Sequence, residues 1–347
     1  LKARAEVGRR LRDAIRSSSI VHMGDGAHPI PLDQIAWPLA GQMGKTRIWV
    51  FDGSDAIPRL RAHAQSRSNV FKRQAWALLV RHREAFTRRA VRESDLVFAH
   101  NAAVVERFAD VWNERCHFFD RTFVTQETLV TDEVWHTRAT ALADVRRPLR
   151  LVVAGRQIGI KGTDHILRAM ALAVREGAAL ELDVIGDGED LASFESLSVE
   201  LGLQDRVHFR GSVPYGTPLF RRMSEAQVMV LANLTPEISR NVLLSMALGL
   251  SIVAYRNPGT DALIESNDAG LLVESGNVEA LARALVASAR DREALVRLAS
   301  NGRRVAAKNT LEACHRQRAD LAMRCALQKI GSTTRPNEVA RSAPLES

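Results

Sequence analysis

The sequence predicts an α/β protein with two doubly wound domains, each built on a parallel sheet. The chain has 347 residues, and at roughly 150 residues per domain this length fits two domains. From Leu149 onward, short apolar runs alternate with amphipathic stretches of helical spacing. Several of these runs, such as VMVLA at 228–232, are continuously apolar, which is typical of parallel strands covered by helices on both faces.

The second half of the chain shows this alternation most regularly. A helix is expected from about Thr163 to Glu176, because Ile166, Met170 and Val174 recur at helical spacing. The predicted strands are 149–153, 180–186, 207–211, 228–232, 251–255 and 270–273, and further helices are predicted at 191–201, 218–225 and 241–248. These elements define a second domain over residues 149–310.

The first half is similar but less regular. Its predicted strands are 20–24, 47–51, 95–99 and 116–119, with helices at about 33–42, 70–92 and 102–110. Residues 130–148 are interpreted as an inter-domain linker, so the first domain is expected to cover residues 1–148. Residues 311–330 are expected to form a C-terminal helix that returns to the first domain, and the polar residues 331–347 a disordered tail.

Composition excludes several classes of protein. Apolar residues make up 46% of the chain and charged residues 25%, and no run of 18 apolar residues could span a membrane. The Arg-rich N-terminal stretch lacks the apolar segment of a signal peptide. The three cysteines, Cys116, Cys314 and Cys325, are too few and too far apart for a disulfide framework or a zinc site. Buried thiols in a reducing cytoplasm are therefore expected.

The net charge of +8 is unevenly distributed. Residues 1–148 hold 24 Lys and Arg against 17 Asp and Glu, whereas residues 149–347 hold 24 against 23. A basic first half and a nearly neutral second half imply different partners for the two halves.

The predicted helix 70–92 concentrates the positive charge of the first half. Its cations are Lys72, Arg73, Arg81, Arg83, Arg88, Arg89 and Arg92, and its apolar residues include Phe71, Trp76, Leu79, Val80, Phe86 and Ala90. A basic amphipathic helix can lie on anionic lipid, which predicts peripheral attachment to the inner face of a membrane. The alternative is an ordinary solvated helix of a domain core. Nucleic acid is not expected, because the chain has no recognised nucleic-acid motif.

The loop 155–162, with the sequence GRQIGIKG, follows the first strand of the second domain. Ligands of parallel sheets bind outside the carboxyl ends of the strands. A forked guanidinium at Arg156 and a mobile ammonium at Lys161 could therefore hold a phosphate. The alternative is a pair of solvated loop cations. The loop does not have the spacing of a Walker motif.

Two further segments follow strand ends of the same domain. Gly186-Asp187-Gly188 is a weak dinucleotide signal, because Leu191 occupies the third glycine position, and a tight turn is the alternative.

Glu237 lies in the loop after strand 228–232, just before the N-terminus of a helix. Helix N-termini attract anions, and a carboxylate beside one can accept hydrogen bonds from hydroxyls. A surface acid and a ligand-binding residue remain equal alternatives for Glu237.

Together these motifs resemble the nucleotide-sugar-binding domain of retaining glycosyltransferases of family 4. The matching segments are GRQIGIKG (155–162), VIGDGED (184–190), VHFRGSV (207–213), the Glu237 segment, PGTDALI (258–264) and AGLLVESGNVEAL (269–281). Their order and number over about 160 residues carry the resemblance. It implies the GT-B fold of two facing Rossmann-like domains. Family members begin with a strand about 60 residues before the VHMG-type strand, so the first domain is expected to be incomplete.

The resemblance implies transfer of a sugar from a UDP- or GDP-sugar to a hydroxyl of a saccharide or lipid-linked acceptor. The configuration at the anomeric carbon would be retained, and no metal or other cofactor is expected. Arg156 and Lys161 match the residues that bind the diphosphate, and Glu237 matches the first Glu of the E-x7-E motif, which holds sugar hydroxyls. Further donor-binding positions are Gly155, Gly186, Gly188, Gly211, Val213, Ile238, Ser239, Arg240, Asn241 and Ser245.

This sequence departs from the family pattern at two places. Ser245 stands where the second Glu of the E-x7-E motif binds the ribose. Asp52 stands where the first domain usually has a His at a strand end, with His22 and His100 at other strand ends. Asp52 could accept a proton or orient an acceptor hydroxyl, and a turn or helix-capping role is the alternative.

The favoured hypothesis is a glycosyltransferase of polysaccharide or glycolipid assembly. The second hypothesis is a catalytically weak GT-B-like protein that binds a nucleotide sugar or acts as a scaffold, because of Ser245 and the short first domain. A nicotinamide dehydrogenase would need a third glycine and an acidic partner for the ribose, and neither is found.

Overall fold

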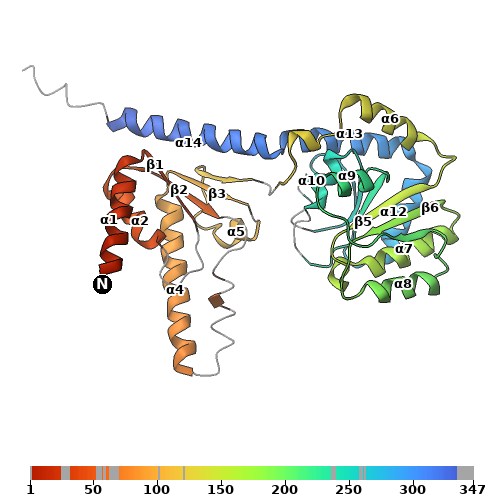
Figure 1. Ribbon diagram of the computed structural model, residues 1–347, viewed down its shortest axis with the longest axis horizontal. Helices are drawn as coiled ribbons and strands as arrows, with labels where there is room; N and C mark the ends of the chain where they lie inside the picture. Colours follow the sequence, from red (N-terminus) through yellow and green to blue (C-terminus); the bar gives the residue numbers. More distant parts are fainter. Residues whose placement is uncertain are drawn as a thin grey trace, which may run out of the picture. The chain divides into compact units, whose positions relative to one another are not determined.

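The structure, a computed structural model, describes residues 2–24, 32–51, 57, 60–61, 70–100, 102–119, 122–235, 240–257, 261 and 263–333. The chain divides into two compact units (Figure 1). The first comprises Leu1–Arg121 and His315–Ser347, and the second comprises Thr122–Cys314. Each unit holds one sheet whose described strands are all parallel.

The first unit is built on a sheet with the strand order β1-β2-β3-β4. Its elements are β1 (Ile20–Gly24), β2 (Thr46–Phe51), β3 (Leu96–Ala99), β4 (Cys116–Phe118), α1 (Lys2–Ser17), α2 (Asp33–Gln42), α4 (Val70–Glu93) and α5 (Ala102–Arg107). Successive side chains of a strand point to opposite faces. Trp49 and Phe51 therefore share one apolar cluster with Trp37 of α2, whereas Ile48 and Phe98 pack with residues of the C-terminal helix α14 (Leu311–Thr333).

The second unit is built on a sheet with the order β10-β9-β8-β5-β6-β7. Its strands are β5 (Leu149–Ala154), β6 (Leu180–Ile185), β7 (Val207–Phe209), β8 (Val228–Leu231), β9 (Ser251–Tyr255) and β10 (Leu271–Val273), and its helices are α6 (Asp132–Ala143), α7 (Thr163–Arg175), α8 (Leu191–Glu200), α9 (Thr217–Met223), α10 (Asn241–Ala247), α12 (Val278–Arg290) and α13 (Arg292–Lys308). The sheet grows from β5 in one direction and then, from β8, in the other. The carboxyl ends of β5 and β8 therefore form a topological switch point, where α/β sheets open a crevice.

The predicted fold class is confirmed. All ten predicted strands are present, and their ends differ by no more than two residues from the predicted ones. The central strands β8 and β9 of the second sheet are fully buried, because apolar clusters cover both faces of the sheet. This burial explains why residues 228–231 and 252–255 are continuously apolar.

The interpretation of residues 130–148 as a linker is wrong. Residues 132–143 form α6, whose first turn is capped by the Thr131 hydroxyl, which accepts a hydrogen bond from the Val134 amide. Arg303 of α13 pairs with Asp132 at 2.8 Å and lies over the Trp135 ring at 5.0 Å. Arg138 donates to the carbonyls of Ser224 and Ala226. These contacts place residues 122–148 in the second unit, so the compact units divide after Arg121 and not after residue 148.

The C-terminal helix α14 extends to Thr333, so the predicted start of a disordered tail at residue 331 is wrong. The division between the two units falls within this helix, between Cys314 and His315. Within the first unit, Lys329 pairs with Asp95 at 2.7 Å and Ala322 packs against the sheet. Both ends of the chain therefore contribute to the first unit.

Helix α4 uses its cations differently from the expectation. Arg83 is buried and forms a two-pronged ion pair with Asp33 of α2, with N–O distances of 2.7 and 3.2 Å. Arg88 pairs with Asp110, and Arg89 pairs with Glu93. Arg83 is thus removed from any lipid-facing surface, and carboxylates balance the other two charges. No helix in the described part of the chain combines the length and apolar character needed to cross a bilayer.

Candidate functional site

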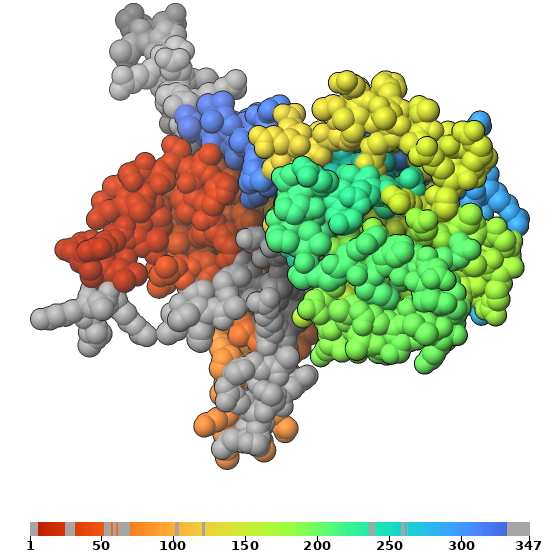
Figure 2. All heavy atoms as spheres, turned by 45° about the vertical axis from the view of Figure 1, so that its right-hand side comes forward, coloured from red at the N-terminus to blue at the C-terminus, as the bar shows by residue number. Residues whose placement is uncertain are grey.

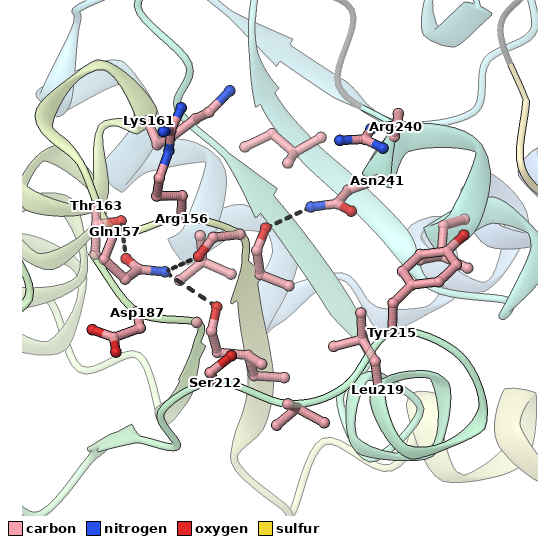
Figure 3. A pocket seen from close by; sticks show the side chains of 18 of the residues that line it. Arg156, Gln157, Lys161, Thr163, Asp187, Ser212, Tyr215, Leu219, Arg240 and Asn241 are labelled. Carbon is pink, nitrogen blue, oxygen red and sulfur yellow. Dashed lines mark hydrogen bonds between the residues drawn. The ribbon is translucent and has the colours of Figure 1, made fainter.

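A cavity of about 840 Å³ opens at the switch point of the second sheet. Its floor comes from the carboxyl ends of β5, β8 and β6, through Ala154, Leu231 and Ile185. Its walls come from the loops that follow these strands and from the start of α10 (Figure 3). The cavity therefore lies where the strand order predicts a ligand site.

Lys161 reaches the cavity from a 3₁₀ turn, η2 (Gly159–Lys161), that ends at Gly162. Gly162 has a φ of +70°, and a Cβ there would lie 2.1 Å from the carbonyl oxygen of Ala232. Only glycine permits this left-handed backbone and this close approach to the end of β8. The amide of Leu234 also donates to the carbonyl of Ile160 at 2.9 Å. The turn that carries Lys161 is thus fixed across the switch point.

Gln157 joins the loop after β5 to the end of β6. Its side chain is 1% exposed, and its Nε2 donates to the carbonyls of Gly155 and Ile185 at 2.9 and 3.2 Å. Its Oε1 accepts a hydrogen bond from the Thr163 hydroxyl at 2.9 Å. A buried amide with all these partners holds its surroundings in one arrangement. Gln157 therefore positions the neighbouring Arg156.

Gly186 permits the β5 and β6 loops to touch. Its φ is +124°, and a Cβ there would lie 1.9 Å from the Gly155 carbonyl oxygen. The amide of Gly155 donates to the carbonyl of Ile185, and the amide of Gly186 donates to that of Gly211. Because a side chain at position 186 would separate these backbones, the sequence needs glycine there.

The cavity is positively charged on its polar side. Of the lining side chains that the structure describes, Arg156, Lys161 and Arg240 are cationic and Asp187 is the one carboxylate. Figure 3 shows Arg156 and Lys161 side by side, with Arg240 and Asn241 across the cavity from them. Asn241 donates to the Ala154 carbonyl at 2.5 Å, which ties the start of α10 to the end of β5. Such an arrangement suits an oxyanion with more than one negative charge.

Another part of the cavity is apolar and aromatic. Tyr215 and Leu219 lie together in the lining (Figure 3), and Val213 also lines the cavity. Tyr215 is 65% exposed, and its ring forms a T-shaped pair with the ring of Phe220 at a centroid distance of 5.4 Å. An exposed aromatic ring supported from one side offers a surface on which a flat, conjugated ring can stack. The cavity thus suits a ligand with an anionic part and an aromatic part.

The described donor-site candidates fall into two groups. Seven line the cavity, namely Gly155, Arg156, Lys161, Gly186, Val213, Arg240 and Asn241. The other three, Gly188, Gly211 and Ser245, are not among the lining residues. Gly188 instead packs against the backbone of Gln157. The remaining candidates Glu237, Ile238, Ser239 and Asp52 lie outside the described residues, so their roles stay predictions.

Ser245 is fully buried in α10, one helical turn after Asn241. Its Oγ has no hydrogen-bond partner among the described atoms. A buried hydroxyl without a partner costs free energy. The predicted contact between position 245 and a ribose would need this hydroxyl to reach the cavity, and the structure does not place it in the lining.

Sequence reasoning missed Gln157, Tyr215 and Phe123. Gln157 stands in a quoted motif, but nothing in the sequence shows that its amide is buried. Tyr215 lies two residues after the segment VHFRGSV (207–213). The chain has only two tyrosines, so the presence of one of them in this loop could have indicated a binding residue. Phe123 lies in a stretch without a motif, and the Arg240 guanidinium lies over its ring at 5.3 Å.

Comparison with known proteins agrees with this geometry. Residues 148–291 match the family model described as Glycosyl transferases group 1. The lipopolysaccharide core biosynthesis glycosyltransferase LpsE of Rhizobium meliloti is 24% identical over 212 residues, which are 61% of this chain and 58% of LpsE. The amylovoran biosynthesis glycosyltransferase AmsK of Erwinia amylovora is 28% identical over 148 residues, 41% of this chain and 36% of AmsK. The matched regions thus span between about a third and three fifths of these relatives.

A solved structure shows the same fold over most of the chain. The structure of Anabaena Alr3699/HepE in complex with UDP superposes with a TM-score of 0.61 at 15% identity, covering 95% of this chain and 82% of that one. The resemblance that the motifs indicate is therefore confirmed at the level of the group, while membership of family 4 stays a prediction. The chain carries a glycosyl transferases group 1 domain in residues 148–291, within a fold of the GT-B type.

Proposed function

We propose that the chain is a glycosyltransferase that moves a sugar from a UDP- or GDP-sugar to a hydroxyl acceptor in polysaccharide or glycolipid assembly, with retention at the anomeric carbon. The observation that carries this proposal is the division of the switch-point cavity into a cationic and an aromatic part. A nucleotide sugar has the same division, because its diphosphate is anionic and its base is flat. The group 1 match and the relatives named for glycosyltransferase activity support it.

In this proposal Arg156 and Lys161 stabilise the leaving diphosphate. Negative charge grows on the β-phosphate oxygen as its bond to the anomeric carbon breaks, and fixed cations at that point lower the barrier. Gln157 and the η2 turn hold the two cations before the donor arrives, so the site needs little reorganisation. Tyr215 and Leu219 bind the base. Glu237 accepts hydrogen bonds from hydroxyls of the sugar.

A panel of UDP- and GDP-sugars tests the proposal. Purified protein is incubated with each donor and a mixed saccharide acceptor, and released UDP or GDP is measured. One donor should give release that falls strongly in Glu237→Ala. Arg283→Ala, which changes an exposed arginine of α12 outside the cavity, serves as the control. Equal turnover of Glu237→Ala and the control would contradict the role assigned to Glu237.

Ser245 favours a second candidate function, a nucleotide-sugar-binding protein with little turnover. A buried serine in the place of a ribose-binding carboxylate removes a charged hydrogen bond worth about 1.5–3 kcal/mol. Calorimetry with UDP, GDP and their sugars separates the two functions. Binding without release of UDP or GDP would favour the second.

We also propose that the amino-terminal half of α4 contacts an anionic membrane surface. Phe71 is 82% and Leu78 is 68% exposed, and Arg73 and Arg81 lie on the same half; α4, in orange, reaches the surface in Figure 2. Exposed apolar side chains and cations together favour anionic lipid.

In sedimentation with phosphatidylglycerol vesicles, the double variant Phe71→Ser with Leu78→Ser should weaken binding to the vesicles. Val199→Ser, at an exposed apolar residue of α8, should not, and equal binding of both variants would contradict the proposal.

A further inference from the structure

Helix α14 covers one face of the first sheet and brings an arginine to it. The side chains of that face include Ile48, Leu96 and Phe98, which pack with Ala322 of α14. His22 shares the face with Ile20, because residues two apart in a strand point the same way. Toward the amino ends of the strands, Lys329 pairs with Asp95. Arg318 lies about three helical turns before Lys329 and reaches the other end of the same face.

Arg318 contacts rings and not carboxylates. Its guanidinium lies over the Phe98 ring at 5.2 Å, and its Nη1 lies 3.4 Å from Nε2 of His100. Within the described part of the chain it forms no ion pair, in contrast to Lys329 on the same helix. The half-buried guanidinium therefore keeps a charge that no acidic side chain of the described segments neutralises.

His100 orients this guanidinium. Its Nδ1 lies 3.1 Å from the carbonyl oxygen of Phe119, and a carbonyl only accepts, so Nδ1 carries the proton. The other ring nitrogen of a neutral imidazole is then an acceptor for the Arg318 N–H. Bound in this way at both nitrogens, the ring fixes the direction of the guanidinium.

The positive charge of Arg318 also acts on His22. Burial and the positive charge of Arg318 lower the pKa of His22 below its ordinary value. The side chain nevertheless remains exposed on the edge strand β1. Among the described residues no acid pairs with either Arg318 or His22, and two cationic or potentially cationic groups that repel one another would both be stabilised by an anion bound there.

We propose that Arg318 and His22 bind a phosphate group carried by the acceptor, with His100 as a positioning residue. The proposal rests on the proposed function, since that function supplies an acceptor. A guanidinium offers paired N–H donors that match phosphate oxygens, and an imidazole adds a second donor or charge. A phosphorylated acceptor thus gains a contact that a neutral saccharide lacks.

The test follows the side-chain signals of the histidines by NMR in full-length protein labelled with ¹³C-histidine. Saturating UDP is present, so that phosphate does not report on the donor cavity, and UDP binding is measured separately by calorimetry. Inorganic phosphate should shift the His22 signal saturably, beyond the effect of chloride at equal ionic strength. Arg318→Gln should weaken this binding about tenfold to hundredfold, whereas Arg324→Gln, an exposed arginine of the same helix, should change it less than twofold.

Each outcome decides the inference separately from the proposed function. No saturable shift with phosphate, or equal binding in Arg318→Gln and Arg324→Gln, would overturn it even if UDP binds normally. A hexose 6-phosphate should shift His22 as phosphate does, and the unphosphorylated hexose should not. A response to inorganic phosphate alone would remove the acceptor from the assignment. Arg318→Lys keeps the charge and should bind with intermediate strength, which separates lost binding from lost folding.

Discussion

The two sheets of this protein contrast in how they present the carboxyl ends of their strands. In the second unit, the order β10-β9-β8-β5-β6-β7 reverses at β5 and β8, and a cavity opens between the loops that leave them. In the first unit, the order β1-β2-β3-β4 has no reversal among the described strands. There an apolar face packs against α14, and the polar contacts of Arg318 with His100 and of Lys329 with Asp95 lie at its two ends. Strand order, as much as residue chemistry, decides whether a parallel sheet opens a crevice.

The two units also differ in what fixes their polar groups. Around the switch-point cavity, backbones touch through glycines and a buried glutamine joins the loops. In the first unit, long side chains pair across helices, as Arg83 and Asp33 do. The second unit should therefore be sensitive to added volume, and the first to the loss of a charge.

The largest expected effect breaks the first unit. Asp33→Asn removes the negative charge that Asp33 places beside the buried guanidinium of Arg83, which should lower the free energy of unfolding by about 3–5 kcal/mol. Urea titration followed by circular dichroism measures this change. Glu265→Gln, which removes an exposed pair with Arg256 in the second unit, should leave the transition unchanged. A loss no larger than that of the control would show that the buried pair is not needed.

The next effect concerns the second unit. Gly186→Ala forces a Cβ against the Gly155 carbonyl in a backbone conformation that alanine avoids, and it should cost more than about 2 kcal/mol. Gly177→Ala has the same kind of positive φ but no atom within 4 Å of the added Cβ, so it should cost only about 1 kcal/mol. Equal denaturation midpoints for the two variants would refute the close contact of the loops.

A smaller effect tests the proposed role of the switch-point cavity. Lys161→Ala should lower kcat/KM about tenfold to hundredfold, because it removes one of the two cations that are proposed to stabilise the leaving diphosphate. Lys308→Ala removes the same charge from the exposed end of α13 and should leave kcat/KM within twofold. Equal kcat/KM values for these two variants would contradict the proposed contact between Lys161 and the diphosphate.

The smallest effect is on proton binding in the first unit. The pKa of His22 is lowered in the folded chain, so the unfolded chain binds the proton more tightly. As the pH falls from the ordinary pKa of histidine to the lower pKa of His22 in the folded chain, protonation of the unfolded chain therefore lowers the free energy of unfolding. Arg318→Gln should raise the pKa of His22 toward that ordinary value, and Arg324→Gln should not. NMR titration of the imidazole measures both, and an unmoved pKa in Arg318→Gln would place Arg318 too far from His22 to share a ligand.

The strands could be predicted because buried parallel strands are continuously apolar, as in residues 228–231 and 252–255. Helix α6 could not be found in that way, since only Trp135 and Leu142 of its residues are buried and no apolar stripe results. Its signal was the cap at Thr131 with two acids after it.

The candidate site shows the same limit. The positions of Arg156 and Lys161 followed from their motif, whereas the lining by Phe123 and the buried hydrogen bonds of Gln157 depend on packing between distant segments. The incomplete first domain, the absence of a metal and the roles of Glu237 and Asp52 stay predictions.

The division of α14 between the two units sets an order of events during synthesis. Residues 122–314 form a continuous stretch, so the second unit has all its parts once Cys314 has left the ribosome. The first unit is complete only after residues 315–333 have been synthesised, although its strands were synthesised about 200 residues earlier. At about 5–20 residues per second, Ile48, Leu96 and Phe98 lack their helical cover for roughly 10–40 s. During that time the nascent chain exposes an apolar sheet face, to which a chaperone would bind.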